Sequence, residues 1–220
     1  VWVLAGGYGR DAWRHSARSL AWLLADHDDP LPSEVERDLH HFRRISRRFS
    51  PTDLSGHDEE DVILRAEDLL VDLVGAPRRR KLLGYYSLYG IELAMENYGV
   101  LPKLRARGYP EVDLELNTDH PTGHRLRVFS RDERRDLLVE LVLREHQGIV
   151  PYRLLSIEWL LLQDPRRSIH PARPLLPGQQ YPGLGLLGEV VGMMIMVCER
   201  LGFDGLLFSP AHFHVAAQAH

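Results

Sequence analysis

The apolar positions along the chain are densest in its last third. Residues 154–163 (LLSIEWLLLQ) carry large hydrophobic side chains at both odd and even positions, which is typical of a central strand with both faces covered. Residues 186–201 (LLGEVVGMMIMVCERL) are apolar almost all the way round a helix. This second pattern predicts a helix that is buried on most sides.

The segments before residue 154 show apolar side chains at every second position. The segments 112–117 (VDLELN), 125–130 (RLRVFS) and 136–145 (DLLVELVLRE) alternate as strands do, and short turn-rich stretches join them. Together with residues 154–163 they predict an antiparallel meander. A last apolar run, 205–210 (GLLFSP), predicts one more strand after the buried helix.

Helical spacing dominates the first half of the chain. Helices are expected over 11–25 after Asp11, 34–48 after Ser33, 61–75, 88–98 after Ser87, and 101–107. A polar stretch with Pro and Gly between Phe49 and Asp61 is the best candidate for a domain boundary. We therefore predict a first domain over 1–50, a linker over 51–60 and a second domain over 61–220.

The first residues carry a motif with chemical meaning. VWVLAGGYG (1–9) is an apolar strand that ends in glycines, so Tyr8 lies at the carboxyl end of a strand. AGGYG followed by an amphipathic helix resembles the last catalytic motif of the zinc-dependent histone deacetylase family. The resemblance implies hydrolysis of an acetyl-lysine or acetyl-polyamine type amide, with the Tyr8 hydroxyl stabilising the oxyanion and Gly6 and Gly7 forming the tight turn. An unrelated glycine-rich turn with a structural tyrosine is the alternative.

The same resemblance implies zinc, but not in this chain. The zinc ligands and catalytic histidines of that family precede the tyrosine motif, so no ligand can be assigned here. We expect residues 1–220 to be a fragment of a bacterial, cytoplasmic parent protein, inactive alone and lacking an N-terminal catalytic portion upstream of Val1. Its fold would begin with the terminal strand–helix piece of an arginase/deacetylase-type α/β domain.

A second motif precedes the buried helix. Glycines in QQYPGLG (179–185) let a ligand approach the backbone, and the free N–H groups of a helix start favour an anion. A Pro-Gly turn without a ligand is the other interpretation. The Gln-x-x-Gly-x-Gly pattern and the order of elements resemble the GNAT acyltransferase fold, an α+β domain with a mostly antiparallel sheet. Residues 164–178 separate the strand from this turn.

The GNAT resemblance implies an acyl-CoA ligand, acetyl-CoA for example. Its binding residues would be Gln180, Gly183, Leu184 and Gly185, and Glu158 in the apolar strand would serve as general base if it is buried. Pairing of Glu158 with an arginine such as Arg153 or Arg167 is the alternative. An acyltransferase or acyl-CoA sensor is thus the second candidate function, and a non-catalytic interaction module is the third.

Composition narrows the choice of partners. The net charge is −4, so no nucleic-acid or anionic-membrane partner is expected. The resemblances imply a small-molecule or acetyl-lysine substrate instead. Cys198 is the single cysteine, and no signal peptide or membrane span is evident. His212 and His214 could bind a metal only with help from His120, His124 or His170, and hydrogen bonds to backbone are the alternative. The pattern does not predict an oligomeric state.

Two groups of side chains have competing uses. Four tyrosines around a glycine could line a substrate groove or serve in packing, and three methionines in the buried helix are expected to fill gaps in the core. The tyrosines are Tyr85, Tyr86, Tyr89 and Tyr98, and the methionines are Met193, Met194 and Met196.

Overall fold

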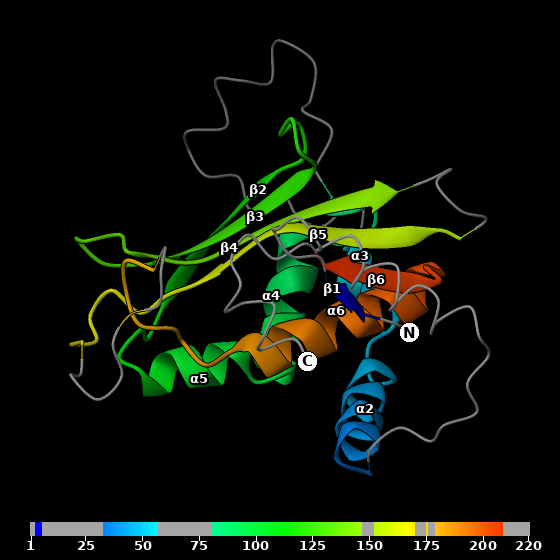
Figure 1. Ribbon diagram of the computed structural model, residues 1–220, viewed down its shortest axis with the longest axis horizontal. Coiled ribbons are helices and arrows are strands. Elements are labelled where there is room, and N and C mark those ends of the chain that lie inside the picture. Colours follow the sequence, from blue (N-terminus) through cyan, green and yellow to red (C-terminus); the bar gives the residue numbers. More distant parts are fainter. Residues whose placement is uncertain are drawn as a thin grey trace, which may run out of the picture.

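The centre of the molecule is one six-stranded sheet in the order β1-β6-β5-β4-β3-β2 (Figure 1). The computed structural model describes residues 3–5, 33–56, 81–146, 152–169, 175 and 179–208. The strands are β1 (Val3–Ala5), β2 (Val112–Asn117), β3 (His124–Ser130), β4 (Leu137–His146), β5 (Leu154–Leu162) and β6 (Gly205–Phe208). Strands β2 to β5 form an antiparallel meander, and β5, β6 and β1 run parallel to one another. The predicted mixed α/β class with a mostly antiparallel sheet is confirmed.

Alternation along the strands explains why the meander was predictable. Leu114 of β2 lies opposite Val128 of β3 and faces the core. On the other face Glu115 lies opposite Arg127, and their side chains form an ion pair of 2.7 Å. The period of two therefore separates apolar from charged positions, as a sheet with one buried face requires.

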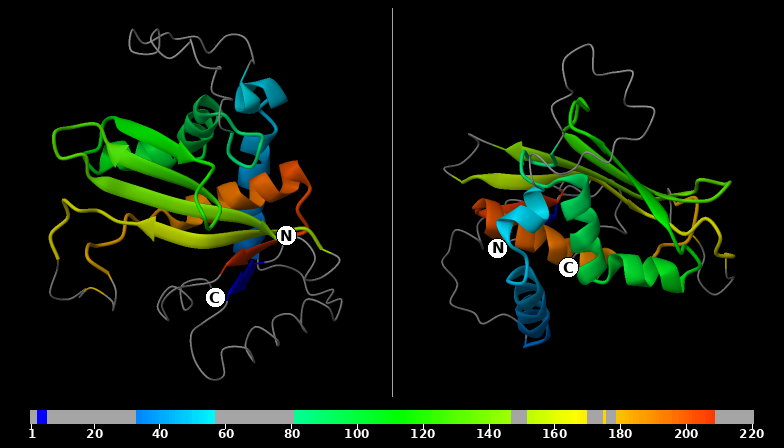
Figure 2. Two further views of the ribbon diagram at one scale, coloured as in Figure 1. Left: turned by 90° about the horizontal axis from the view of Figure 1, so that it is seen from above. Right: turned by 180° about the vertical axis from the view of Figure 1, so that it is seen from behind.

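The described helices α4, α5 and α6 cover one face of the sheet (Figures 1 and 2). Ser87 caps α4 as predicted, because its Oγ accepts a hydrogen bond of 3.0 Å from Gly90 N. The helices are α2 (Ser33–Ser46), α3 (Pro51–Ser55), α4 (Leu88–Asn97), α5 (Val100–Ala106) and α6 (Leu187–Leu201). The helices expected over 11–25 and 61–75 lie outside the described residues.

The core lies between α6 and the sheet. Met193, Met194 and Met196 are only 9%, 4% and 3% exposed, so their predicted use as core residues is confirmed. Leu155 and Ile157 of β5 are 0% and 1% exposed and belong to the same cluster. Residue Cys198 is also fully buried, and burial raises the pKa of its thiol to about 12.

The described residues on both sides of the expected linker share one sheet and one core. β1 pairs with β6, with Val3 opposite Leu206. Helix α2 packs on α6, where the Phe42 ring occupies the space a Cβ of Gly192 would need. The first residues of the expected linker 51–60 form α3, which Ser50 begins with a capping box.

Candidate functional site

The glycine turn lies directly against the end of β5. Asp164 N donates a hydrogen bond of 2.7 Å to Pro182 O, and Leu184 N donates one of 3.4 Å to Leu162 O. The chain after Asp164 therefore returns to the point where it left. The strand leads into the turn in space, although residues 164–178 separate the two in the sequence.

The turn is anchored by one side chain and open elsewhere. Leu184 is 0% exposed and sits in the core, whereas Gly183 and Gly185 are exposed. A Cβ at Gly183 would meet nothing nearer than Leu162 O at 3.7 Å. Gly185 has φ +62°, a conformation that favours glycine. The structure thus brings Gly183, Leu184 and Gly185 together as one accessible stretch of backbone, with Gln180 exposed just before it.

The start of α6 adds free donors and a positive charge to this turn. No side chain caps the helix at Leu186, so its first N–H groups have no side-chain acceptor. Nη2 of Arg107 lies 3.2 Å from the position of a Cβ at Gly185. The Arg107 side chain forms no ion pair within the part of the chain that the structure describes. The only acidic residue of the first turn, Glu189, pairs with Lys103, so the local field favours an anion.

A buried polar pair braces the turn from behind. The Tyr109 hydroxyl donates a hydrogen bond of 2.7 Å to Oδ1 of Asp164, which is 5% exposed. Burial, and then the hydrogen bond to Asp164, raises the pKa of Tyr109. Arg166 lies over the Tyr109 ring at 4.5 Å and binds Asp136 through Nε at 3.0 Å. These contacts fix Asp164 and with it Pro182.

Glu158 has a partner that the sequence did not indicate. Its Oε1 lies 3.1 Å from Nε2 of His146, and the two side chains are 28% and 26% exposed. The expected burial of Glu158 is therefore only partial. Pairing with Arg153 is wrong for this structure, because Arg153 pairs with Glu145 at 3.3 Å; among the described contacts Arg167 does not reach Glu158 either.

Several sequence candidates fall elsewhere. Tyr8, Gly6 and Gly7, together with His170, His212 and His214, lie outside the described residues. His124 has a structural role, since its Nδ1 accepts a hydrogen bond of 2.9 Å from Leu83 N. His120 bonds Thr122 within its own turn at 2.9 Å. Within the described ranges, no group of three or more His, Cys, Asp or Glu residues could hold a metal ion.

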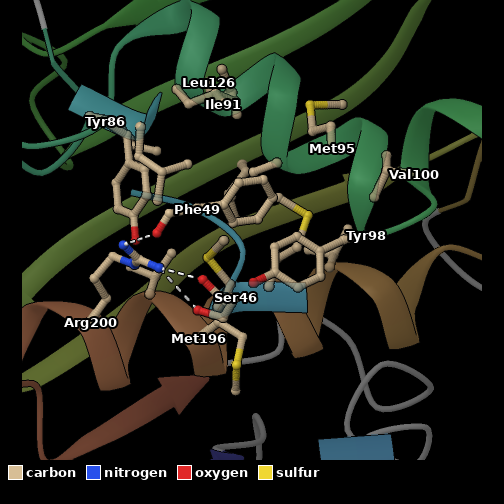
Figure 3. Close-up of a pocket in the computed structure, with 18 of the residues that line it drawn as sticks. Ser46, Phe49, Tyr86, Ile91, Met95, Tyr98, Val100, Leu126, Met196 and Arg200 are labelled. Atoms are coloured by element: carbon tan, nitrogen blue, oxygen red, sulfur yellow. Dashed lines mark hydrogen bonds between the residues drawn. The ribbon is translucent and has the colours of Figure 1, made fainter. Parts of the chain in front are cut away.

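An apolar cavity of about 60 Å³ lies in the core between the helices and the sheet (Figure 3). Tyr86 and Tyr98 line it and are 5% and 8% exposed, so both serve in packing. Arg200 at its margin donates to the backbone oxygen of Ser46 at 2.7 Å and of Phe49 at 3.5 Å. Its guanidinium is thus committed to the end of α2, and the cavity belongs to the core.

A groove of about 420 Å³ lies on α4, α5 and the start of β2. Tyr89, 58% exposed, stands at this groove. Two charges on its walls are already paired, because Arg105 binds Glu96 through two hydrogen bonds. Because these two side chains pair with each other, the groove offers fewer free polar groups to a ligand than the turn around Gly185 does.

Sequence reasoning missed two residues of the site. In the sequence Arg107 is only the last residue of a predicted helix, and the packing of α5 beside the turn reveals its place. His146 ends a strand whose alternation predicts its face, but the sequence holds no signal for a contact with Glu158, because that contact depends on strand register.

Comparison with models of protein families, with curated proteins and with solved structures gave no match. No helix in the described ranges is both long and apolar enough to cross a bilayer. The family therefore stays a prediction from the two motifs.

Proposed function

We propose that the domain built on this sheet is GNAT-like and binds a coenzyme A thioester, with the phosphates at the turn before α6. The observation that carries the proposal is the meeting of three features at one point. An open glycine backbone, an uncapped helix start and the guanidinium of Arg107 all lie beside Gly185. Each attracts a phosphate, and together they suit a pyrophosphate.

The parallel pair β5–β6 adds support. Ligands of sheets with parallel strands bind at the carboxyl ends of those strands. The turn meets β5 at its carboxyl end, where Leu184 N reaches Leu162 O at 3.4 Å. Leu184 holds the loop in the core while the glycines beside it stay exposed. A thioester arm could then run from the phosphates back along β5.

Calorimetric titration with acetyl-CoA tests the proposal. Arg107→Ala should weaken binding about tenfold to a hundredfold, the usual worth of a hydrogen bond to a charged group. Arg105→Ala is the matched control on the same helix, because Arg105 binds Glu96 instead of facing the turn. Pantetheine, which lacks the phosphates, should bind far more weakly than acetyl-CoA. Absence of heat at several hundred micromolar acetyl-CoA would reject the proposal.

A variant of the turn tests where the phosphates lie. A Cβ at Gly183 has open space around it, with Leu162 O at 3.7 Å as its nearest neighbour. Gly183→Val should therefore leave stability nearly unchanged while placing carbon where a phosphate must approach. Unchanged affinity for acetyl-CoA in this variant would move the ligand away from the turn.

Amide deacetylation is the second candidate, and the Gly6-Gly7-Tyr8 motif supports it. Strand β1 ends at Ala5, directly before that motif. Among the described residues, no group of three or more His, Cys, Asp or Glu side chains could hold a zinc ion. In the whole protein that contains this sequence, Tyr8→Phe should lower kcat on an acetyl-lysine peptide about a hundredfold, as loss of an oxyanion donor does. Equal turnover would remove Tyr8 from the reaction.

A further inference from the structure

Strand β2 forms one edge of the sheet, because β3 is its only neighbour among the described strands (Figure 2). Arg131 N donates a hydrogen bond of 3.0 Å to Glu111 O, so the odd-numbered residues along β2 direct their backbone groups to β3. Val112, Leu114 and Leu116 therefore direct their N–H and C=O groups outward, and no described residue bonds to these groups. An edge of this kind can accept an additional strand.

The groove on α4, α5 and the start of β2 reaches the first residue of this edge strand. Val112 lines it together with Leu93, Leu101 and Leu104, so its floor is apolar. Tyr89, which is 58% exposed, adds an aromatic ring at the rim. An apolar floor suits the methylene stem of a long side chain, and an aromatic ring suits the cation at its end. The groove therefore favours a lysine or arginine side chain.

The charges that line the groove also favour a cation. Glu96 is bound by Arg105, and Glu111 lies 3.5 Å from Arg131 in a second ion pair. The remaining carboxylate, Glu92, is exposed and forms no hydrogen bond or ion pair with another described residue. The lining thus keeps one negative charge that the described arginines do not bind. A positive group on a ligand would complement this charge.

A second copy of this chain suits the edge less well than a basic partner does. If the two-fold axis of an antiparallel pair of β2 strands passed through Leu114, Asp113 would lie opposite Glu115 of the second copy. If the axis passed through Asp113 or Glu115, that carboxylate would lie opposite its own counterpart. Like charges directly opposite each other destabilise a strand pair. Charge complementarity therefore favours a different chain with positive side chains.

We propose that the free edge of β2 and the adjoining groove form a docking site for an extended basic peptide. The peptide adds a strand beside β2 and places an arginine or lysine side chain in the groove, next to Glu92 and Tyr89. Hydrogen bonds to the backbone of β2 supply affinity, and the groove supplies specificity. Side chains alternate along a strand, so every second residue of the peptide faces the side of the groove. This docking site does not depend on the proposed binding of a coenzyme A thioester.

Fluorescence anisotropy with synthetic peptides and the full chain tests the site. The probe is a fluorescein-labelled peptide of about ten alternating valines and threonines with one central arginine, long enough to pair along all of β2. Citrulline, the neutral isostere of arginine, should weaken binding about fivefold, the usual effect of an exposed ion pair. In Glu92→Gln the two peptides should bind equally. The matched control is Glu133→Gln in the β3–β4 turn, an exposed glutamate that should leave the difference unchanged.

Methylation of the peptide nitrogens tests the addition of a strand. Methyl groups on every second residue of the arginine peptide remove the donors from one of its edges and leave the other edge intact. The two alternately methylated peptides should differ in affinity about tenfold or more, because one has lost the donors that face β2 and the other has lost donors that face solvent. Equal affinity of both methylated peptides and the unmodified peptide would overturn the proposal.

Other results would also overturn the proposal. They are no change in anisotropy up to millimolar protein, equal binding of the arginine and citrulline peptides, and displacement of the peptide by equimolar acetylarginine amide, which would make the groove a site for small cations. A dimer whose cross-links map to β2 would assign the edge to a second copy. Binding that appears only after Arg78, Arg79 and Arg80 are replaced by serine would assign it to the chain's own basic segment. Because none of these measurements uses acetyl-CoA, they leave the proposed function untouched.

Discussion

Helices α4 and α6 begin in opposite ways. Ser87 caps α4, and its backbone N–H donates a hydrogen bond of 2.9 Å to Leu54 O. A Cβ at Gly90 would overlap the Leu54 backbone, so α3 closes over this end. The start of α6 has no side-chain cap, and a Cβ at Gly188 in its first turn would meet nothing within 4 Å.

The difference shows what each helix start contributes. Free N–H groups at a helix start need an acceptor from the protein, from water or from a ligand. At α4 the fold supplies the acceptor and gains stability. At α6 the position stays open, next to Arg107, and the polar contacts that hold it lie behind the turn rather than on the helix. The start of α6 is uncapped, and the turn that leads to it is held from behind. This arrangement favours binding of an anion over stabilisation of the helix.

The largest effect is expected from Gly90→Ala. The new methyl group would overlap Leu54 O and force α3 away from α4, which should cost about 3 kcal/mol in the free energy of unfolding. Gly188→Ala is the matched control, since it has open space in a helix and should gain up to about 1 kcal/mol. Urea unfolding of both variants measures the two effects. Equal stabilities would contradict the contrast between a closed and an open start.

The second-largest loss of stability is expected from Tyr109→Phe. It leaves the Asp164 carboxylate, 5% exposed, without its side-chain donor, at a cost of about 2 kcal/mol. The control is Tyr89→Phe, because Tyr89 is 58% exposed. Thermal unfolding with and without acetyl-CoA should show that the variant also loses affinity, because Asp164 fixes Pro182 and the turn. Full stability in Tyr109→Phe would mean that the turn is held by other contacts.

Ser87→Ala removes the cap of α4. Its hydrogen bond to Gly90 N is lost, and we expect the free energy of unfolding to fall by about 1 kcal/mol. Ser87→Asn keeps an acceptor and should recover most of it. Because Ser87 bonds Leu54 and Gly90 and not the glycine turn, affinity for acetyl-CoA should stay within the error of the titration. A change in affinity would show that the two helix starts are coupled.

The smallest effect is expected on the stability of the protein at acid pH. A hydrogen bond from Arg166 is the largest cause that lowers the pKa of Asp132 below its ordinary value near 4. Its contribution is present above the unfolded pKa and is lost as the pH falls through the lower folded value. Stability should therefore decline below about pH 4, and less steeply in Asp132→Asn. Parallel slopes in the two proteins between pH 5 and 2 would show that Asp132 adds nothing to the brace.

Local pattern predicted the elements well. The alternation of Leu114 and Leu116 with charged residues fixed β2 at its observed bounds, and Ser87 marked the start of α4. Both signals act within a few residues, so the sequence contains them completely. Within the expected linker, Pro51 and the polar residues after it form the short helix α3, which Ser50 caps.

Contacts between distant residues could not be predicted in this way. Arg107 reaches Gly185 because α5 packs beside the turn, and Gly90 matters because Leu54 approaches it. His146 meets Glu158 through a one-residue bulge that shifts the register of β5. No local periodicity records such a shift, so the glycine turn was predictable from sequence and its charged neighbours were not.

The hydrogen bond between Asp164 and Pro182 also bears on how this molecule can be altered. A chain segment whose two ends touch can change its length without moving the elements that it joins. Doubling such a segment adds only about 0.6 kcal/mol of closure entropy. The stretch between these two residues is thus the natural place to graft a peptide tag or a fluorescent reporter within reach of the turn.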